Sequence, residues 1–274
     1  MASIRSLALV GAVGGAGTTR TTVECAAALA RDGRDVAVLD AAYATQGLGE
    51  FVRGHIDPDL TALCLDPERS LDDGLYDLDT SVEGRIALAP ANAPFERLAR
   101  ASDDAAAQAL ADRAAEAVAR FDHVLVDVPP IAANPSIAAV HAVDRVAIVA
   151  PDTEHGADGR RRQRDVLRDV DAPDRDPAAV AVAVPGSGDR SDGNGDDGTG
   201  SGETDADATV PRGPVEFAAA PACLGTDAFA AGVVAATEAL FETELDVKFE
   251  DSGVIGRLSA GVDRVRGGRG RTGP

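Results

Sequence analysis

Aromatic residues and cysteine are scarce in this sequence, and each scarcity excludes a class of structure. Tryptophan is absent and aromatic residues make up 3% of the chain, so any core must be built mainly from Ala, Val and Leu. The three cysteines, Cys25, Cys64 and Cys223, lie far apart and form no C-x-x-C pair. This spacing excludes a disulfide framework and a zinc ribbon, and it predicts free thiols in a reducing cytoplasm.

Lysine is almost missing as well. Lys248 is the single lysine among 26 basic residues, and the formal net charge is −20. Such a composition is typical of proteins from organisms that accumulate salt, and it also occurs in acidic proteins of GC-rich genomes. In either case the charge solvates the surface and does not identify a partner. No apolar run approaches the length of a membrane span.

A glycine-rich loop near the start of the chain is the strongest signal. The apolar run 7–10 leads into Gly-Ala-Val-Gly-Gly-Ala-Gly-Thr-Thr at 11–19, and an Ala-rich stretch follows to Leu29. Glycines allow positive φ and a close approach of the backbone to a ligand, and the helix N-terminus adds its positive dipole end. The segment fits the phosphate-binding pattern G-x-x-x-x-G-K-[ST] everywhere except at the lysine.

The loop resembles that of the ParA/MinD family of deviant-Walker P-loop ATPases, which usually reads K-G-G-x-G-K-[ST]-T. The first lysine of that family falls on Val13 and the P-loop lysine falls on Thr18, so both cations are missing. The resemblance implies that the chain is a degenerate member, with Thr19 as the hydroxyl that holds Mg²⁺. It assigns nucleotide binding to Gly14, Gly15, Ala16, Gly17, Thr18, Thr19 and Arg20.

A second apolar run, at 35–39, ends in Asp40. In the ParA/MinD family, which this chain resembles, the corresponding strand ends in D-x-D. The two carboxylates of that motif act on Mg²⁺ and on the attacking water. Here Ala42 replaces the second carboxylate, which leaves Asp40 as the catalytic candidate. An Asp at the end of a strand is also a common cap or turn residue.

The segment 121–130 is the second strong signal. Apolar residues lead into Asp127 and are followed by two prolines, which is similar to the family pattern Y-D-x-h-h-h-D-x-P. The resemblance gives Asp127 the role of holding Mg²⁺ together with Thr19. The alternative is a buried strand that happens to end in Asp. The histidines have no partners at metal-ligand spacing, so no metal site of the protein's own is expected.

The order of the remaining patterns predicts an α/β fold. We expect further strands at 85–88, 145–150 and 178–184, and a last strand at 215–217. Short helices are expected at 61–65, 71–78 and 135–142, and longer helices at 101–120, 159–170 and 228–240. Such alternation implies a mainly parallel sheet of the P-loop NTPase kind with helices on both faces. The domain is expected to span 1–245 and to contain a disordered acidic insertion at 186–209.

The end of the chain, 246–274, reverses the charge of the rest and is rich in arginine. Its apolar residues between 254 and 266 fall on one helical stripe flanked by arginines, as in an interfacial helix. Contact with a membrane through this tail is one expectation, and a packed helix or a solubilising tail is the alternative. A homodimer and an unidentified protein partner are also expected. Nucleic acid is not, because the arginines at 160–168 are interpreted as a solvated helix face.

Taken together, these patterns favour a cytoplasmic, ParA/MinD-like protein of cell organisation, acting in chromosome partitioning or division-site positioning. It would bind ATP or ADP with Mg²⁺ and hydrolyse ATP weakly or not at all. One alternative is a working ATPase that uses Arg20 or a cation from a partner. Arg20 lies about 200° around the helix from the lysine position, which places it poorly for that role. A scaffold that binds no nucleotide is the remote alternative.

Overall fold

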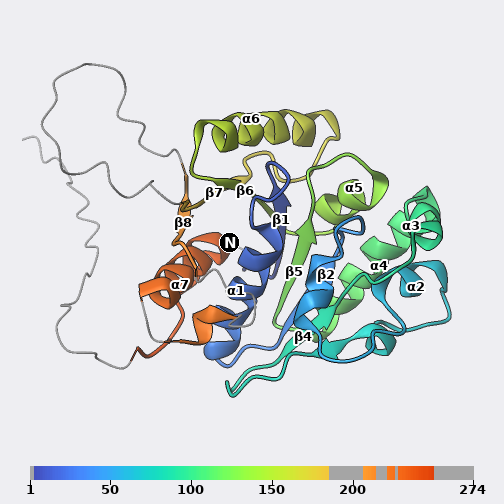
Figure 1. Ribbon diagram of the computed structural model, residues 1–274, viewed down its shortest axis with the longest axis horizontal. Helices are drawn as coiled ribbons and strands as arrows, with labels where there is room; N and C mark the ends of the chain where they lie inside the picture. The colour runs from blue at the N-terminus through green and yellow to red at the C-terminus, as the bar shows by residue number, and fades with distance from the viewer. Residues whose placement is uncertain (1–2, 185–205, 214–220, 226–227, 250–274) are drawn as a thin grey trace, which may run out of the picture.

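The computed structural model describes residues 3–184, 206–213, 221–225 and 228–249 (Figure 1). Its centre is an eight-stranded sheet with the order β3-β4-β2-β5-β1-β6-β7-β8. The strands are β1 (Ser6–Gly11), β2 (Val36–Asp40), β3 (Tyr76–Asp77), β4 (Ile86–Ala89), β5 (His123–Val128), β6 (Arg145–Pro151), β7 (Ala178–Val182) and β8 (Ala208–Val210). All neighbours pair in parallel except β3 and β4. The expected mainly parallel α/β sheet is therefore confirmed.

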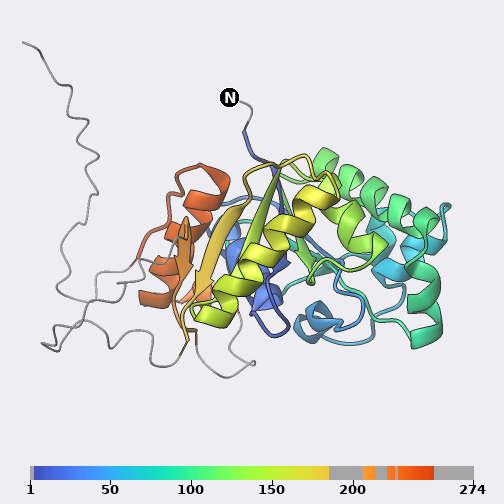
Figure 2. The ribbon, with the colours of Figure 1, turned by 90° about the horizontal axis from the view of Figure 1, so that it is seen from above.

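Helices cover both faces of this sheet. One face packs against α1 (Thr18–Arg31) and α7 (Ala228–Phe241). The other packs against α2 (Leu60–Leu65), α4 (Asp104–Arg120), α5 (Asn134–His141) and α6 (Glu154–Asp169), with α3 (Phe95–Ala101) beside α2 and α4. In Figure 2 strands β7 and β8 lie between α7 and α6. Strands that are buried on both faces have nearly continuous apolar sequences, and for this reason they could be predicted from the sequence.

Side chains of β1 alternate between the two cores. Leu7 and Leu9 belong to the core under α1, whereas Ala8 and Val10 belong to the core under α4 to α6. The central part of α1, from Thr21 to Ala30, is buried. Because alanine has only a methyl side chain, this helix can lie close against the sheet. Phe51, Phe229 and Phe241 fill the same core beside it.

Several expected elements differ in extent. The helix expected at 101–120 begins at Asp104, where Asp103 caps it, and α3 precedes it. The expected helix at 71–78 is wrong, because Leu71–Gly74 form a 3-10 turn and Tyr76–Asp77 form β3. The helix expected at 159–170 begins earlier, at Glu154, where the Thr153 hydroxyl accepts a hydrogen bond from the backbone N–H of Gly156.

The predicted insertion 186–209 ends too late, because Ala208 and Thr209 belong to β8. Three expected features lie outside the described residues: the part of the insertion at 186–205, the strand at 215–217 and the tail helix at 254–266. In the part of the chain that is described, no helix combines the length and the apolar character needed to cross a membrane.

Helix α1 is fastened to the C-terminal part of the chain by a buried carboxylate. The two oxygens of Glu24 accept hydrogen bonds from the backbone N–H groups of Ala222 (2.9 Å) and Cys223 (2.6 Å). At the other end of the helix, the Arg31 guanidinium donates to the carbonyls of Cys223 (2.6 Å) and Gly225 (2.7 Å). Because the Glu24 side chain is only 1% exposed, these bonds are what makes its burial tolerable.

His123 is buried at the beginning of β5. Its ring packs edge-on against Phe241 with centroids 4.8 Å apart, and its Nε2 lies 3.3 Å from a guanidinium nitrogen of Arg34. Burial, followed by the positive charge of Arg34, lowers the pKa of His123 from 6.5 to about 4. The histidine is therefore an uncharged, packed core residue at neutral pH.

Replacement of His123 by Phe should make the protein less sensitive to acid. The folded state keeps His123 neutral down to about pH 4, whereas the unfolded chain protonates it below about 6.5. Stability that is fully present above pH 6.5 is therefore lost as the pH falls towards 4, by at most about 1.4 kcal/mol per pH unit. Urea unfolding between about pH 4 and 7 should show a shallower decline for His123→Phe. Equal slopes for the two proteins would contradict this role.

Candidate phosphate and magnesium site

The loop between β1 and α1 has the backbone shape that the glycines predict. Gly15 and Gly17 adopt positive φ values of 75° and 82°, which only glycine accepts without strain. Gly14 and Gly15 are exposed, and a Cβ atom added to either would meet nothing within 4 Å. The loop therefore leaves open space above its glycines, at the carboxyl edge of the sheet.

The beginning of α1 offers hydrogen-bond donors to that space. Gly17 precedes the helix and provides no side-chain cap. Within the described part of the chain, the backbone N–H groups of Thr18 and Thr19 make no hydrogen bond, as expected for the first turn of a helix. Uncapped donors at the positive end of a 14-residue helix form an anion site, so the residues present suit a phosphate group.

Thr18 and Val13 occupy the two positions at which the ParA/MinD family has lysine, and their side chains pack against neighbouring elements. The hydroxyl of Thr18 lies against the end of β1, 2.8 Å from where a Cβ of Gly11 would stand. The side chain of Val13 lies against α6, with Cγ1 2.6 Å from a Cβ placed on Gly159. Neither side chain brings a charge to the loop.

Thr19 and Asp127 meet directly. The hydroxyl of Thr19 donates a 2.6 Å hydrogen bond to Oδ2 of Asp127, which lies on β5 next to β1. A hydroxyl and a carboxylate are ligands suited to Mg²⁺, directly or through water. No group of three or more His, Cys, Asp or Glu in the described residues could hold a metal by itself. Mg²⁺ at this pair would therefore share its coordination with phosphate oxygens.

Asp40 lies beside this pair but faces inward. Its Cα is the register partner of Asp127, and its side chain is fully buried. One carboxyl oxygen accepts from the N–H of Ala42 at 2.9 Å and the other from Ala91 at 3.3 Å. Asp40 thus joins the turn after β2 to the segment after β4. With both oxygens engaged, Asp40 is poorly placed to position a water molecule.

Burial raises the pKa of both carboxyls above the ordinary value for aspartate. The rise is larger for Asp40, because the charge of Asp127 adds to the effect of burial. The hydrogen bond from Thr19 opposes the rise in the pKa of Asp127 and favours its charged form. The environment therefore favours a charge on Asp127 and a neutral Asp40.

The segment after β2 closes over Thr19. Gln46 adopts a left-handed backbone, with φ of 52°, and its side-chain amide donates to the carbonyl of Ala93 at 2.8 Å. The following Gly47 packs on Thr19, since a Cβ there would lie 3.2 Å from the threonine hydroxyl. Gly47 therefore covers the Thr19–Asp127 pair, and Gln46 fixes the segment to the residues that follow β4.

Arg20, expected at the phosphate, has another partner. Its Nε donates to Glu24 at 2.5 Å, one helical turn along α1. Its Nη2 is buried, and it lies 3.6 Å from where a Cβ of Gly213 would stand. The guanidinium is thus held between α1 and the segment that follows β8.

Solved structures with the same fold include three that are relevant to this site. The cell division ATPase MinD from Pyrococcus furiosus matches with a TM-score of 0.63 and 19% identity, covering 85% of this chain and 98% of that one. A single-residue variant of McdA from Cyanothece, in complex with ATP, matches with a TM-score of 0.53 and 22% identity over 66% and 71% of the two chains. Cobyrinic acid a,c-diamide synthase from Mycobacterium smegmatis, with ADP and magnesium, matches with a TM-score of 0.53 and 23% identity over 65% and 74%.

No protein-family model and no curated protein matches the sequence. At these identities the structural likeness establishes the fold, and one fold can host several reactions. The neighbours illustrate this, because a cell division ATPase and a cobyrinic acid a,c-diamide synthase share the architecture. The fold alone therefore does not determine the function of this chain.

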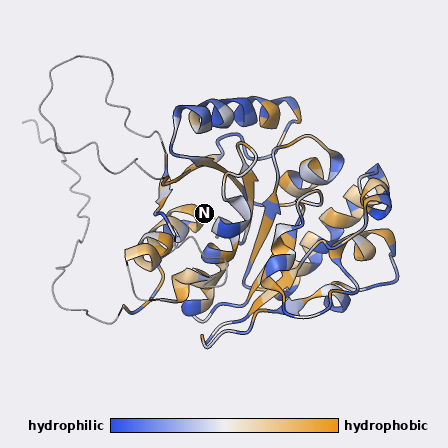
Figure 3. Cartoon of the chain, viewed as in Figure 1, coloured by the Kyte–Doolittle hydropathy of each residue, from blue (hydrophilic) through white to orange (hydrophobic). Residues whose placement is uncertain are grey.

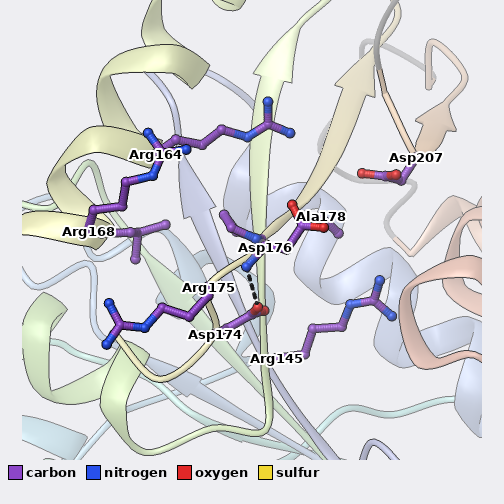
Figure 4. Close-up of a pocket in the computed structure, with 10 residues that line it drawn as sticks. Arg145, Arg164, Arg168, Asp174, Arg175, Asp176, Ala178 and Asp207 are labelled. Carbon is purple, nitrogen blue, oxygen red and sulfur yellow. Dashed lines mark hydrogen bonds between the residues drawn. The ribbon is translucent and has the colours of Figure 1, made fainter. Parts of the chain in front are cut away.

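A cavity of about 380 Å³ lies at the opposite edge of the sheet, at the amino ends of β6 and β7 (Figure 4). Its charged side chains are those of Arg145, Arg164, Arg168, Asp174, Arg175, Asp176 and Asp207. Three of its arginines form ion pairs, with Glu242, Asp165 and Asp171. Two of its carboxylates accept backbone N–H groups. Most of these charges thus serve the packing of this edge, away from the glycine loop.

Replacement of Gly159 by Ala should destabilise the protein. The added methyl would lie 2.6 Å from Val13 and 2.8 Å from the carbonyl oxygen of Ala12. Overpacking of this kind costs about 1–3 kcal/mol, and it opposes the gain of about 1 kcal/mol that alanine brings to a helix. We expect a net loss in the free energy of unfolding, measured by denaturant titration.

The matched control is Gly14→Ala, where the methyl meets open space. This variant should stay within about 0.5 kcal/mol of the parent protein. A Gly159→Ala protein that is as stable as the control would mean that α6 does not rest on the loop.

Proposed function

We propose that the chain is a ParA/MinD-like nucleotide-binding protein of cell organisation that binds ATP or ADP with Mg²⁺ and hydrolyses ATP very slowly or not at all. The observation that carries the proposal is the Thr19–Asp127 hydrogen bond beneath an open glycine loop whose two lysine positions hold Val13 and Thr18. Residues suited to hold magnesium are in place while the loop's own cations are absent.

The binding half of the proposal rests on the backbone. Donors at the start of α1 and the positive φ values of Gly15 and Gly17 form a cradle for phosphate. Thr19 and Asp127 would hold Mg²⁺, which would neutralise part of the phosphate charge. The likeness to ATP-bound McdA and to MinD supports this assignment. A scaffold that had lost its ligand would have no physical need for so many glycines in one loop.

The slow-hydrolysis half rests on missing charge. A phosphoryl group in transfer is stabilised by cations aimed at its oxygens, and their removal typically costs orders of magnitude in rate. The carboxyl beside the Thr19–Asp127 pair, that of Asp40, has both oxygens bonded to the backbone. Ala42 offers no second carboxylate. An ATPase that relies on Arg20 is less favoured, because that guanidinium is paired with Glu24.

The biological role proposed from the resemblance is positioning within the cell, either of chromosomes or of the division site. Slow turnover would suit a protein that reports nucleotide occupancy to a partner. Contact with a membrane through residues 254–266 and assembly of two copies stay part of the proposal.

In molar KCl with Mg²⁺, the full-length protein should bind labelled ATP and show little or no steady-state release of phosphate. Replacement of Asp127 by Ala should abolish the Mg²⁺-dependent part of binding, because it removes the carboxylate that meets Thr19. Asp112→Ala, at an exposed position on α4, is the control for loss of one acidic charge. Equilibrium dialysis and a phosphate-release assay provide the two measurements. Turnover of about 1 s⁻¹ or faster, lost in Asp127→Ala, would refute the slow-hydrolysis half, and absence of ATP binding would refute the whole.

Replacement of Thr18 by lysine, at the position of the missing P-loop lysine, should increase the affinity for ATP without a matching increase in the rate of hydrolysis. We expect Thr18→Lys to bind ATP about tenfold more tightly or better, since a charged donor to phosphate contributes about 1.5–3 kcal/mol. Turnover should not rise in proportion, because Asp40 and Ala42 still leave the water unplaced. Thr18→Ser keeps the hydroxyl without the charge and should bind as the parent does. Unchanged affinity in Thr18→Lys would mean that the loop does not present its donors to phosphate.

A further inference from the structure

Helix α6 rests directly on the glycine loop. Gly159 permits this contact, because it packs on Ala12 and Val13. Gly156, one turn earlier, packs on the carbonyl of Pro151 at the end of β6. A side chain at position 159 would stand 2.8 Å from the carbonyl oxygen of Ala12, so only glycine allows the approach. The first two turns of α6 therefore lie beside the loop, as the position of α6 above the end of β1 in Figure 1 also shows.

This helix is unusually basic, and Figure 3 colours most of it as hydrophilic. Its arginines are Arg160, Arg161, Arg162, Arg164 and Arg168. Arg161 pairs with Asp158, Arg168 pairs with Asp165, and Arg164 lines the distant cavity. Arg162 is exposed. Arg160, the residue next to Gly159, differs from these four arginines: it is half-buried and does not line that cavity.

Arg160 lies on the inner side of the helix. It follows Gly156 by four residues and precedes Gln163 by three, and both of these are buried. Arg160 itself is half-buried, and no ion pair or side-chain hydrogen bond joins it to another residue in the described part of the chain. A half-buried guanidinium that no described carboxylate pairs with, in a chain of net charge −20, is a cation that can bind an anionic ligand.

Helix geometry sets the direction of this side chain. Side chains in an α-helix lean towards its N-terminus. Because α6 begins just after the end of β6 and runs back along the sheet, its N-terminus lies at the carboxyl edge. Arg160 therefore leans towards the edge that carries the glycine loop, and not towards the cavity at the opposite edge.

We propose that Arg160 supplies the positive charge that the loop's own sequence lacks, and that it contacts phosphate oxygens of a nucleotide held over residues 14–19. This inference rests on the proposed function and names a residue that the sequence patterns did not assign to the site. A planar guanidinium can give two parallel hydrogen bonds to one phosphate, and it keeps its charge under all physiological conditions. The glycines at 156 and 159 would then serve to bring this cation within reach.

The test compares two arginines of the same helix in the full-length protein. Dissociation constants for ATP with Mg²⁺ would be measured in molar KCl for the parent, Arg160→Ala, Arg160→Lys and Arg162→Ala. Loss of a charged donor to phosphate should weaken ATP binding by about ten- to a hundredfold in Arg160→Ala. Arg160→Lys should recover part of the affinity, and Arg162→Ala, with the same change in net charge, should match the parent.

Inorganic tripolyphosphate provides a second readout that involves no base or sugar. It should displace ATP from the parent, and its own affinity should fall in Arg160→Ala by a factor similar to that for ATP. Thermal unfolding without ligand should give matching midpoints for the two alanine variants, which would show that α6 remains in place.

The outcomes separate the two proposals. If the parent binds ATP and Arg160→Ala binds it equally well, or if both alanine variants weaken it equally, Arg160 is not a phosphate ligand while nucleotide binding stands. If the parent does not bind ATP, both proposals fall. A selective loss in Arg160→Ala with partial recovery in Arg160→Lys supports the assignment.

Discussion

The hydrogen bond between Thr19 and Asp127 is the contact on which the candidate site depends. It joins the first residues of α1 to the end of β5 and can form only because β5 lies next to β1 in the parallel order of the sheet. Asp40 is positioned by the same order, since β2 pairs with β5 and brings its last residue level with Asp127. The open loop, the uncapped helix start and the covering segment around Gly47 are all arranged about this bond.

Burial divides the two neighbouring carboxyl groups into different roles. Asp127 receives a hydroxyl donor, which favours its charged form, whereas Asp40 receives only backbone donors in a fully buried position. Two negative charges side by side in a fully buried site would repel each other strongly, so the site holds Asp40 neutral and leaves the charge on Asp127. The same arrangement leaves Asp40 acting as a connector between the turns after β2 and β4 rather than as a group exposed to solvent.

Much of this architecture could be predicted from sequence because it lies in local patterns. The buried strands are continuous apolar runs, and the glycine loop and Asp127 carry their signatures in a few adjacent residues. The beginning of α6 was missed, since Gly156 and Gly159 lower helix propensity and their use is visible only once the loop packs on them. The brief strand β3 was missed because Tyr76–Asp77 carries no alternating pattern. The pairing of Arg20 with Glu24 had a local signal, a four-residue spacing on one helix, that could have been weighed against a role at the phosphate.

The attachment of α1 to residues 222–248 has a consequence for synthesis on the ribosome. Glu24 is buried against Ala222 and Cys223, 198 and 199 residues later, and Arg31 reaches the carbonyl of Lys248 as well. Until those residues leave the exit tunnel, the helix that begins at the phosphate loop has a carboxylate facing an incomplete core. The nascent chain can thus assemble its central strands early, whereas α1 gains these hydrogen bonds only after residues 222–248 have been synthesised.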